Sequence, residues 1–165
     1  MEQRFGGLSS PVAFLRAAWF MENFAWDIRA ARDEGVFRSF LQPLDHAIPM
    51  VATDDIGRVA AALLQESWSG SRTIELEGPA LVSGHDVGQA LASVLGHPVR
   101  TEIVPRDQWE TGFRAAGMKH PIPRIQMLDG FNEGWIAFSG EAEQRKGATT
   151  LEQVLAHLAA SAQAD

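Results

Sequence analysis

The sequence has no cysteine and no tyrosine among its 165 residues. Without cysteine there is no disulfide framework, no cysteine zinc site, no iron–sulfur ligation and no thiol catalysis. Without tyrosine, a mechanism that needs a phenol as proton donor must find another group. Positive charge is scarce too, since 14 Lys and Arg stand against 21 Asp and Glu, for a formal net charge of −7. This balance argues against a nucleic acid or an anionic membrane as a partner held by bulk charge.

Long apolar runs are also missing. No stretch approaches the roughly 18 residues that span a bilayer. The polar N-terminus carries Glu2 and Arg4, with no apolar segment behind a basic start. We therefore expect no membrane partner and a cytoplasmic location. The length fits a single domain, and 45% hydrophobic with 21% charged residues is typical of a globular chain.

Common catalytic and metal motifs are absent as well. None of the five histidines has a spacing typical of a metal site. There is no Gly-x-Ser-x-Gly elbow, no P-loop and no Gly-x-Gly-x-x-Gly dinucleotide fingerprint. Asp54 and Asp55 stand at a predicted helix start, where the helix dipole favours them without a catalytic role. We expect no metal site, and we assign no catalytic residue.

Apolar periodicity predicts strands and helices in alternation. Apolar runs and period-two patterns predict five strands: Val12–Leu15, Val36–Leu41, Ile48–Ala52, Thr73–Glu77 and Val99–Val104. Spacings of three and four predict helices over Phe20–Arg32, from an N-cap at Thr53 or Asp54 to about Ser67, Ser83–Gly96, Asp107–Gly117, Ile125–Phe138 and Leu151–Leu158. This alternation is typical of the α/β class.

Local signals refine these elements. The strict alternation of Thr73–Glu77 predicts a strand with one face toward water. Ser83 with Asp86 resembles a capping box, and Gly35 and Gly96 are expected to end helices. The polar segment Glu141–Thr149 is expected to be a loop.

Two segments are candidates for a functional site. The first, Ala17–Asn23, leaves the carboxyl end of the first predicted strand, where open α/β sheets bind ligands. It offers small residues, two aromatic rings and a side-chain amide; the alternative is a plain strand-to-helix turn with Trp19 and Phe20 in the core. The second, Met127–Ile136, combines aromatics with glycines, each of which costs about 1 kcal/mol in a helix. That cost suggests close packing or a pocket wall; the alternative is a core helix broken by a loop.

Four segments, in order, resemble one known family. Phe14–Asn23 is similar to the LRPxxFMEN segment of the NmrA-like proteins, an atypical branch of the short-chain dehydrogenase/reductases. Val51–Ala61 resembles the DIgxvAA step of that family, Ile74–Pro79 its leGP strand end, and Asp129–Ile136 its DGFNxGWI stretch. The resemblance runs from about Ser10 to Leu158.

The resemblance implies the C-terminal half of a Rossmann-like doubly wound sheet with a small substrate-side subdomain. The glycine-rich βαβ unit, which holds the pyrophosphate in that family, would precede residue 1, as would its Tyr-x-x-x-Lys pair. We therefore expect residues 1–165 to be one domain of an NAD(P)-dependent oxidoreductase of the quinone or carbonyl reductase type. As this chain, it is expected to bind NAD(P)(H) weakly or not at all, so that catalysis by the chain alone is doubtful.

The resemblance also assigns site residues. It places five residues near the nicotinamide: Ala17, Ala18, Trp19, Phe20 and Asn23. It places five near the substrate: Trp19, Phe20, Met127, Phe131 and Trp135. Ala17 stands where the family usually has proline, so this turn is less preset.

A different class of function stays open. The chain would then be a non-catalytic NAD(P)-sensing, regulatory or protein-interaction module that forms a homodimer through its exposed sheet. A second copy or a complementary chain that carries the glycine-rich half is expected to cover that surface.

Overall fold

The computed structural model describes residues 2–5 and 7–162. The strands there are β1 (Val12–Ala17), β2 (Trp19–Phe20), β3 (Val36–Ser39), β4 (Ile48–Val51), β5 (Ser71–Glu77), β6 (Leu81–Val82), β7 (Arg100–Ile103) and β8 (Glu143–Lys146). The helices are α1 (Glu2–Phe5), η1 (Met21–Trp26), α2 (Ile28–Glu34), α3 (Thr53–Leu63), α4 (Gly84–Leu95), η2 (Arg106–Gln108), α5 (Trp109–Ala115), α6 (Ile122–Asn132) and α7 (Leu151–Ser161), of which η1 and η2 are 3₁₀ helices. Within this part of the chain, no helix is long and apolar enough to cross a bilayer.

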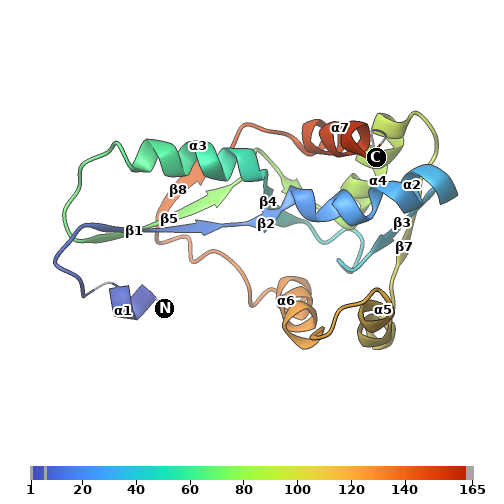
Figure 1. Cartoon of the computed structure of the whole chain (residues 1–165), viewed down its shortest axis with the longest axis horizontal. Helices are drawn as coiled ribbons and strands as arrows, with labels where there is room; N and C mark the ends of the chain where they lie inside the picture. The colour runs from blue at the N-terminus through green and yellow to red at the C-terminus, as the bar shows by residue number, and fades with distance from the viewer. Residues whose placement is uncertain (1, 6, 163–165) are drawn as a thin grey trace.

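The strands pair mainly in parallel. In the first sheet β5 lies between β1 and β8 and runs parallel to both. In the second, β4 lies between its parallel partner β2 and its antiparallel partner β6, and β3 and β7 form a separate parallel pair. Because β1 leads almost directly into β2, the first and second sheets follow one another along the long axis (Figure 1). The predicted α/β class is confirmed.

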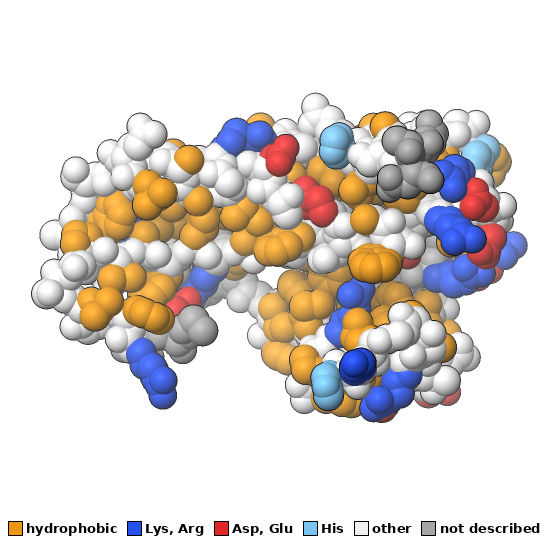
Figure 2. All heavy atoms as spheres, viewed as in Figure 1, with side chains coloured by type: hydrophobic (Ala, Val, Ile, Leu, Met, Phe, Trp, Pro, Cys, Tyr) orange, Lys and Arg blue, Asp and Glu red, His pale blue; other side chains and the backbone are white. Residues whose placement is uncertain are grey.

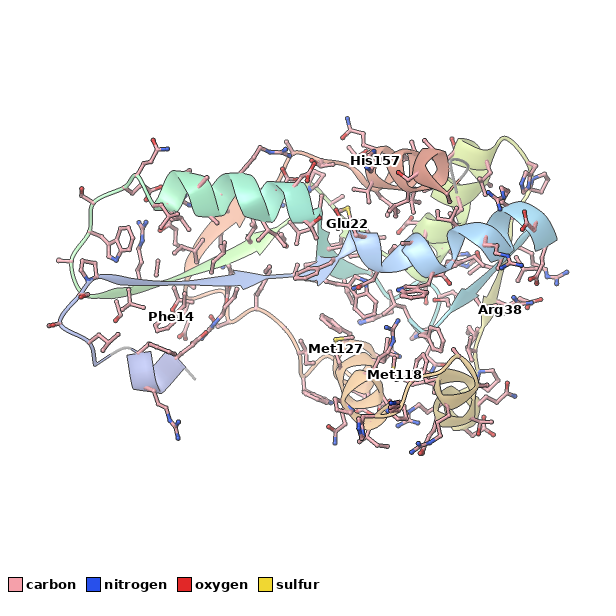
Figure 3. The ribbon with its side chains drawn as sticks, viewed as in Figure 1. Phe14, Glu22, Arg38, Met118, Met127 and His157 are labelled. Carbon is pink, nitrogen blue, oxygen red and sulfur yellow. The ribbon has the colours of Figure 1, made fainter. Side chains whose placement is uncertain are left out.

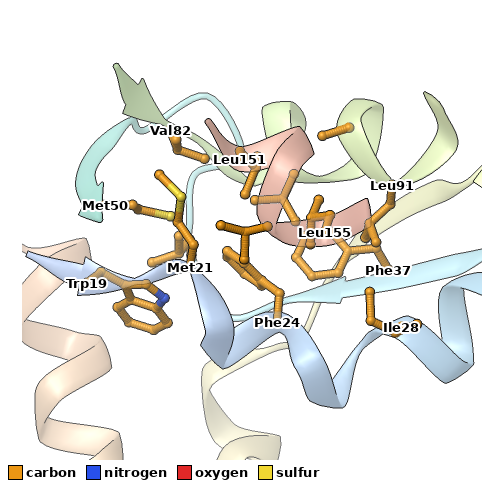
Figure 4. Packing of buried hydrophobic residues seen from close by; sticks show 14 of the residues in the cluster. Trp19, Met21, Phe24, Ile28, Phe37, Met50, Val82, Leu91, Leu151 and Leu155 are labelled. Atoms are coloured by element: carbon orange, nitrogen blue, oxygen red, sulfur yellow. The ribbon is translucent and has the colours of Figure 1, made fainter. Parts of the chain in front are cut away.

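The main core lies where η1, α2, α4 and α7 meet the strands. Met21, Phe24 and Ile28 come from η1 and α2, and they pack with Leu91 of α4 and Leu155 of α7 (Figure 4). All five are buried. Replacing a fully buried leucine of this kind by alanine costs about 2–5 kcal/mol. This core holds the strand-to-helix turn that follows β2.

The predicted helix over Phe20–Arg32 is wrong in its first part. Trp19 and Phe20 are still strand, and because neighbouring strand residues point to opposite faces, Trp19 is buried while Phe20 is 42% exposed. Six residues of 3₁₀ helix follow before α2 begins at Ile28. The spacing of four between Phe24 and Ile28 does reflect a shared buried side, because both are core residues.

β5 has no open face at its centre, so the prediction of one face toward water is wrong there. Ile74, Glu75 and Leu76 are all fully buried. Glu75 is tolerated because its carboxylate accepts hydrogen bonds from the Ser139 N–H (2.8 Å), the Ser139 hydroxyl (2.9 Å), the Gly140 N–H (3.2 Å) and the Gln144 amide (2.6 Å). The alternation of Thr73–Glu77 therefore reflects a buried, ionised Glu75 and not a strand face that is open to solvent.

The predicted loop over Glu141–Thr149 is also wrong, because it contains β8. The polar strand Glu143–Lys146 pairs with Ile74–Glu77 of β5. Its side chains are held by ion pairs, such as Arg145 with Glu66 at 2.9 Å and Lys146 with Glu77 at 3.1 Å. An edge strand held by charge carries no apolar signal, which is why the pattern suggested a loop.

Helix ends follow the predicted signals unevenly. The Ser83–Asp86 capping box is confirmed, and Gly35 and Gly96 end helices in the left-handed conformation at φ 66° and 73°. The predicted N-cap at Thr53 or Asp54 is wrong: α3 begins at Thr53 itself, whose N–H donates to the Glu22 carboxylate at 2.8 Å.

The last predicted helix before α7 is displaced. It runs over Ile122–Asn132 rather than Ile125–Phe138. Gly134 then adopts a φ of 78°, and the Ile136 N–H donates back to the Gly130 carbonyl at 3.0 Å. The chain therefore turns back onto α6 instead of continuing it.

Candidate functional site

The first candidate segment lies where β1 and β2 end. The Ala18 N–H donates to the Leu76 carbonyl of β5 at 2.9 Å, and Trp19 and Phe20 pair with Met50 and Val51 of β4. Ala18 and Trp19 are buried, whereas the Phe20 ring is partly exposed. The segment is thus built into two sheets at once, which fixes the direction in which each side chain points.

The structure brings the two candidate segments into contact through one pair of rings. Trp19 and Phe131 pack edge to face, with ring centroids 5.2 Å apart. Met127, on the same helix as Phe131, packs against the main core. Trp135 does not join them, because it is 60% exposed and its indole N–H donates to the Glu133 carboxylate at 3.0 Å.

Gly130 has the close approach that the sequence predicted for the second segment. A Cβ at Gly130 would lie 2.5 Å from the Ile136 side chain and 2.9 Å from the Trp135 ring. The glycine in α6 therefore makes room for the turn that follows the helix.

A cavity of about 480 Å³ separates α5 and α6 from the strand-to-helix turn. Figure 2 shows a hollow between the lobe of α5 and α6 and the rest of the molecule, with hydrophobic side chains gathered on its walls. In Figure 3, Met118 lies on the α5–α6 side and Arg38 on the side of β3. The aromatic residues that line the cavity are Trp19, Phe24, Trp26, Phe37, Phe40 and Phe113.

Two of the residues that line this cavity carry a polar atom without a partner. The indole N–H of Trp19 and the Nε–H of Arg124 are shielded from solvent, and neither has a hydrogen-bond acceptor among the described residues. The Arg124 guanidinium lies over the Phe113 ring, 5.2 Å from its centroid. Two buried, unpartnered donors suit a ligand that brings acceptor oxygens.

Asp27 is the acidic residue that lines the cavity. Burial raises the pKa of its carboxyl to about 7, and the charge of Arg124 nearby opposes this rise only in part. At neutral pH a large share of Asp27 is therefore uncharged and carries an O–H. The arrangement can hold a planar aromatic molecule and can offer it hydrogen-bond donors.

The predicted site residues are divided between two places. Trp19 and Asn23 line the large cavity. Phe131 lines a second cavity of about 310 Å³ with Gly134, Ile136 and Gln144. The other predicted residues line neither of the two cavities, namely Ala17, Ala18, Phe20, Met127 and Trp135.

Sequence reasoning missed most of the cavity wall. Asp27 lies only four residues beyond the candidate segment that ends at Asn23. Phe113 lies in the predicted helix Asp107–Gly117, and Arg124 ends the segment with Pro121 and Pro123, whose prolines predict a connection but which instead begins α6. The sequence does carry a signal for this wall. Aromatic residues and a methionine beside the segment with Pro121 and Pro123 are compatible with two helices that cover a pocket.

No protein-family model matches the chain. Among curated proteins, the prestalk A differentiation protein A of Dictyostelium discoideum is 25% identical over 122 residues, which are 73% of this chain and 40% of that protein. The festuclavine dehydrogenase of Aspergillus fumigatus is 36% identical over 87 residues, which are 52% of this chain and 30% of that protein. The chain thus spans less than half the length of these curated relatives.

Solved structures share the fold. The Citrobacter sp. triphenylmethane reductase complexed with NADP(H) aligns with a TM-score of 0.69 at 19% identity, over 88% of this chain and 52% of that one. An NADPH-dependent quinone oxidoreductase from Escherichia coli aligns with a TM-score of 0.67 at 18% identity, over 86% of this chain and 52% of that one. The predicted Rossmann-like fold is confirmed over about half of the solved chains' length, and the likeness to these reductases and to the festuclavine dehydrogenase agrees with the predicted resemblance to NmrA-like, atypical short-chain dehydrogenase/reductases.

Proposed function

Since the chain is related to the NmrA-like reductases, we propose that it forms the substrate-binding part of an NAD(P)H-dependent reductase for a quinone or a similar conjugated carbonyl. The observation that carries this proposal is the aromatic cavity of about 480 Å³ beyond the carboxyl end of β2. In open α/β sheets, ligands bind at this edge. The unpartnered donors of Trp19 and Arg124 favour a substrate with acceptor oxygens.

The cofactor of the proposed reductase is NAD(P)H. The partly exposed Phe20 ring offers a face for its nicotinamide ring, whereas Ala18 is buried and its N–H donates to the Leu76 carbonyl. The bound cofactor would supply a hydride. The sequence has no glycine-rich fingerprint for the pyrophosphate. The roles of Ala17, Ala18, Trp19, Phe20 and Asn23 at the nicotinamide stay predictions.

Calorimetry with NADPH tests the cofactor part of the proposal. The chain is expected to bind NADPH more weakly than about 100 μM, because the phosphates contribute much of the affinity for a dinucleotide. Micromolar binding to the 165-residue chain would contradict it.

Equilibrium dialysis with 1,4-naphthoquinone tests the cavity. Ala116 lines the cavity and is exposed, so Ala116→Trp should fill the space without disturbing the core and should weaken binding at least roughly tenfold. Ala61→Trp, at an exposed position of α3, is the matched control and should bind like the wild type. Equal binding by both variants would place the quinone elsewhere.

The exposed edge of β1 supports a second candidate function, as an interaction module. Among the described strands, β1 pairs with β5 alone, so its other edge is open. Phe5 and Leu8, just before β1, are 48% and 54% exposed. We infer that a second copy or a complementary chain covers this edge. The single-domain organisation and the cytoplasmic location stay predictions.

A further inference from the structure

The carboxyl group of Asp27 lies in the cavity without a structural task. Asp27 precedes α2, but its side chain accepts no hydrogen bond from the helix backbone. Among the described residues it forms no ion pair within 4.0 Å, and it is partly buried. A carboxyl that the fold leaves without a partner at a cavity wall is available to a ligand.

The charged groups around Asp27 come from two neighbouring elements. Arg124 on α6 is the nearer influence, since its charge acts on the Asp27 carboxyl. Arg38 on β3 also lines the cavity, but its guanidinium donates to the Glu34 carboxylate at 2.9 Å. The lining residues of α5, Gly112 and Phe113, carry no titratable group. Asp27 is therefore the group in this cavity whose charge can change near neutral pH.

We propose that Asp27 donates a proton to the oxygen of the substrate in this cavity. The inference rests on the proposed function. In the reduction, the conjugated carbonyl would take up a hydride, which bound NAD(P)H would supply, and a proton, and its C=O would become C–OH. The proton comes from the Asp27 O–H bond, which breaks and leaves a carboxylate. Arg124 stabilises that carboxylate until solvent returns the proton.

A conjugated substrate connects the two ends of the site. Trp19 and Asp27 line one cavity although η1 separates them in the chain. In a quinone, an electron pair accepted at one end of the π system appears as charge on the oxygen at the other end. The substrate carbon that would accept a hydride from the bound cofactor therefore need not lie at Asp27, which holds the proton for the oxygen. A small isolated ketone, whose carbon and oxygen are adjacent, does not need this separation.

Binding of 1,4-naphthoquinone at different pH tests the proposal on the chain itself. We expect affinity at about pH 5.5 to exceed that at about pH 8.5 roughly tenfold, since only the protonated carboxyl donates to the quinone oxygen. Naphthalene has no acceptor oxygen and should bind equally at both. Equilibrium dialysis measures both compounds, and the absence of cysteine removes loss of quinone by thiol addition.

Variants assign the pH dependence to one residue. Asp27→Asn keeps a hydrogen-bond donor but cannot ionise, so its affinity should be independent of pH and close to that of the wild type at low pH. Asp33→Asn, on the helix that Asp27 precedes but in a surface ion pair with Arg32, is the matched control and should keep the wild-type profile. An Asp27→Asn variant that also keeps the wild-type profile would overturn the proposal.

The outcomes separate the two claims. If neither compound binds at any pH, the cavity is not the substrate site and the proposed function fails. If both bind but the quinone shows no pH dependence, the function stands and the role of Asp27 is overturned. Should Asp27→Asn not fold, ¹³C NMR of the wild-type carboxyl decides: titration near pH 7 that moves upward with quinone supports the proposal, and titration near pH 4 overturns it.

Discussion

Two carboxyl groups in this molecule, the partly buried Asp27 and the fully buried Glu75, have pKa values shifted in opposite directions. Burial disfavours the charge of both Asp27 and Glu75. At Asp27 the opposing influence is the charge of Arg124, and the pKa rises to about 7. At Glu75 the hydrogen bonds from Gln144, Ser139 and Gly140 outweigh burial, and the pKa falls to about 2. The difference lies in the hydrogen-bond donors in direct contact. Glu75 has them and is a carboxylate that stabilises the fold, whereas Asp27 lacks them among the described residues and is free to donate a proton.

Replacing Glu75 should destabilise the fold and change its pH dependence. Glu75→Gln turns an amide toward the donors of Ser139, Gly140 and Gln144, so we expect the Tm at about pH 6 to fall by roughly 5–10 °C. The wild type binds fewer protons at Glu75 when folded than when unfolded. The ionised Glu75 carboxylate therefore stabilises the folded state. This contribution to the free energy of unfolding is complete above about pH 4.5 and is lost as the pH falls toward about 2, and the Glu75→Gln variant should lack it.

Thermal unfolding followed by circular dichroism at several pH values measures both effects. Glu77→Gln is the control, because Glu77 lies on the same strand and pairs with the exposed Lys146 at 3.1 Å. Its Tm should change by less than about 2 °C. Equal losses in the two variants would mean that the hydrogen bonds of Glu75 are not what holds the segment before β8.

At the scale of elements, α6 shows how a glycine inside a helix serves the turn behind it. Alanine is the better helix former by about 1 kcal/mol, but a Cβ at Gly130 would collide with Ile136 and Trp135. We expect Gly130→Ala to displace the Trp135 ring and to lower stability by about 1 kcal/mol or more.

Gly57→Ala supplies the comparison for that variant. A Cβ at Gly57 in α3 would meet nothing within 4 Å, so this change should stabilise the protein by about 0.5–1 kcal/mol. Urea unfolding gives the free energies, and tryptophan fluorescence reports the displacement of Trp135. A stabilised Gly130→Ala would show that the turn yields easily to the extra methyl group.

Elements with an apolar period were predictable, and those held by polar contacts were not. α4 and α7 follow their apolar stripes, and the Ser83–Asp86 box starts α4 where expected. β8 was not predicted, because its four residues are polar and are held by ion pairs. In the site, the candidate segment after the first strand contains Trp19 and Asn23, which line the large cavity. Asp27 was not predicted as a site residue, because the residues around it come from α6 and β3, which are distant in the sequence.

At the scale of the whole molecule, the open edge of β1 should make the chain associate. Light scattering on a concentrated sample is expected to give about twice the monomer mass of 18.0 kDa. Substituting Phe5 and Leu8 together by lysine should restore the monomer if their exposed surface takes part.

Ile103→Lys is the control for association. Ile103 is 43% exposed but lies on β7, which belongs to a different sheet, so its substitution should leave the mass unchanged. A wild-type chain that stays monomeric at high concentration would count against the interaction module.

The order of strands in the first sheet also determines when the molecule can finish folding. β1 finds its partner only at Ser71–Leu76, and β5 finds its second partner only at Glu143–Lys146. Such distant pairings fold slowly, because a long loop must close before any contact forms. During synthesis, the carboxylate of Glu75 must wait for Ser139, Gly140 and Gln144 before it has partners. The emerging chain therefore carries an unfinished first sheet until Glu143–Lys146 has left the ribosome.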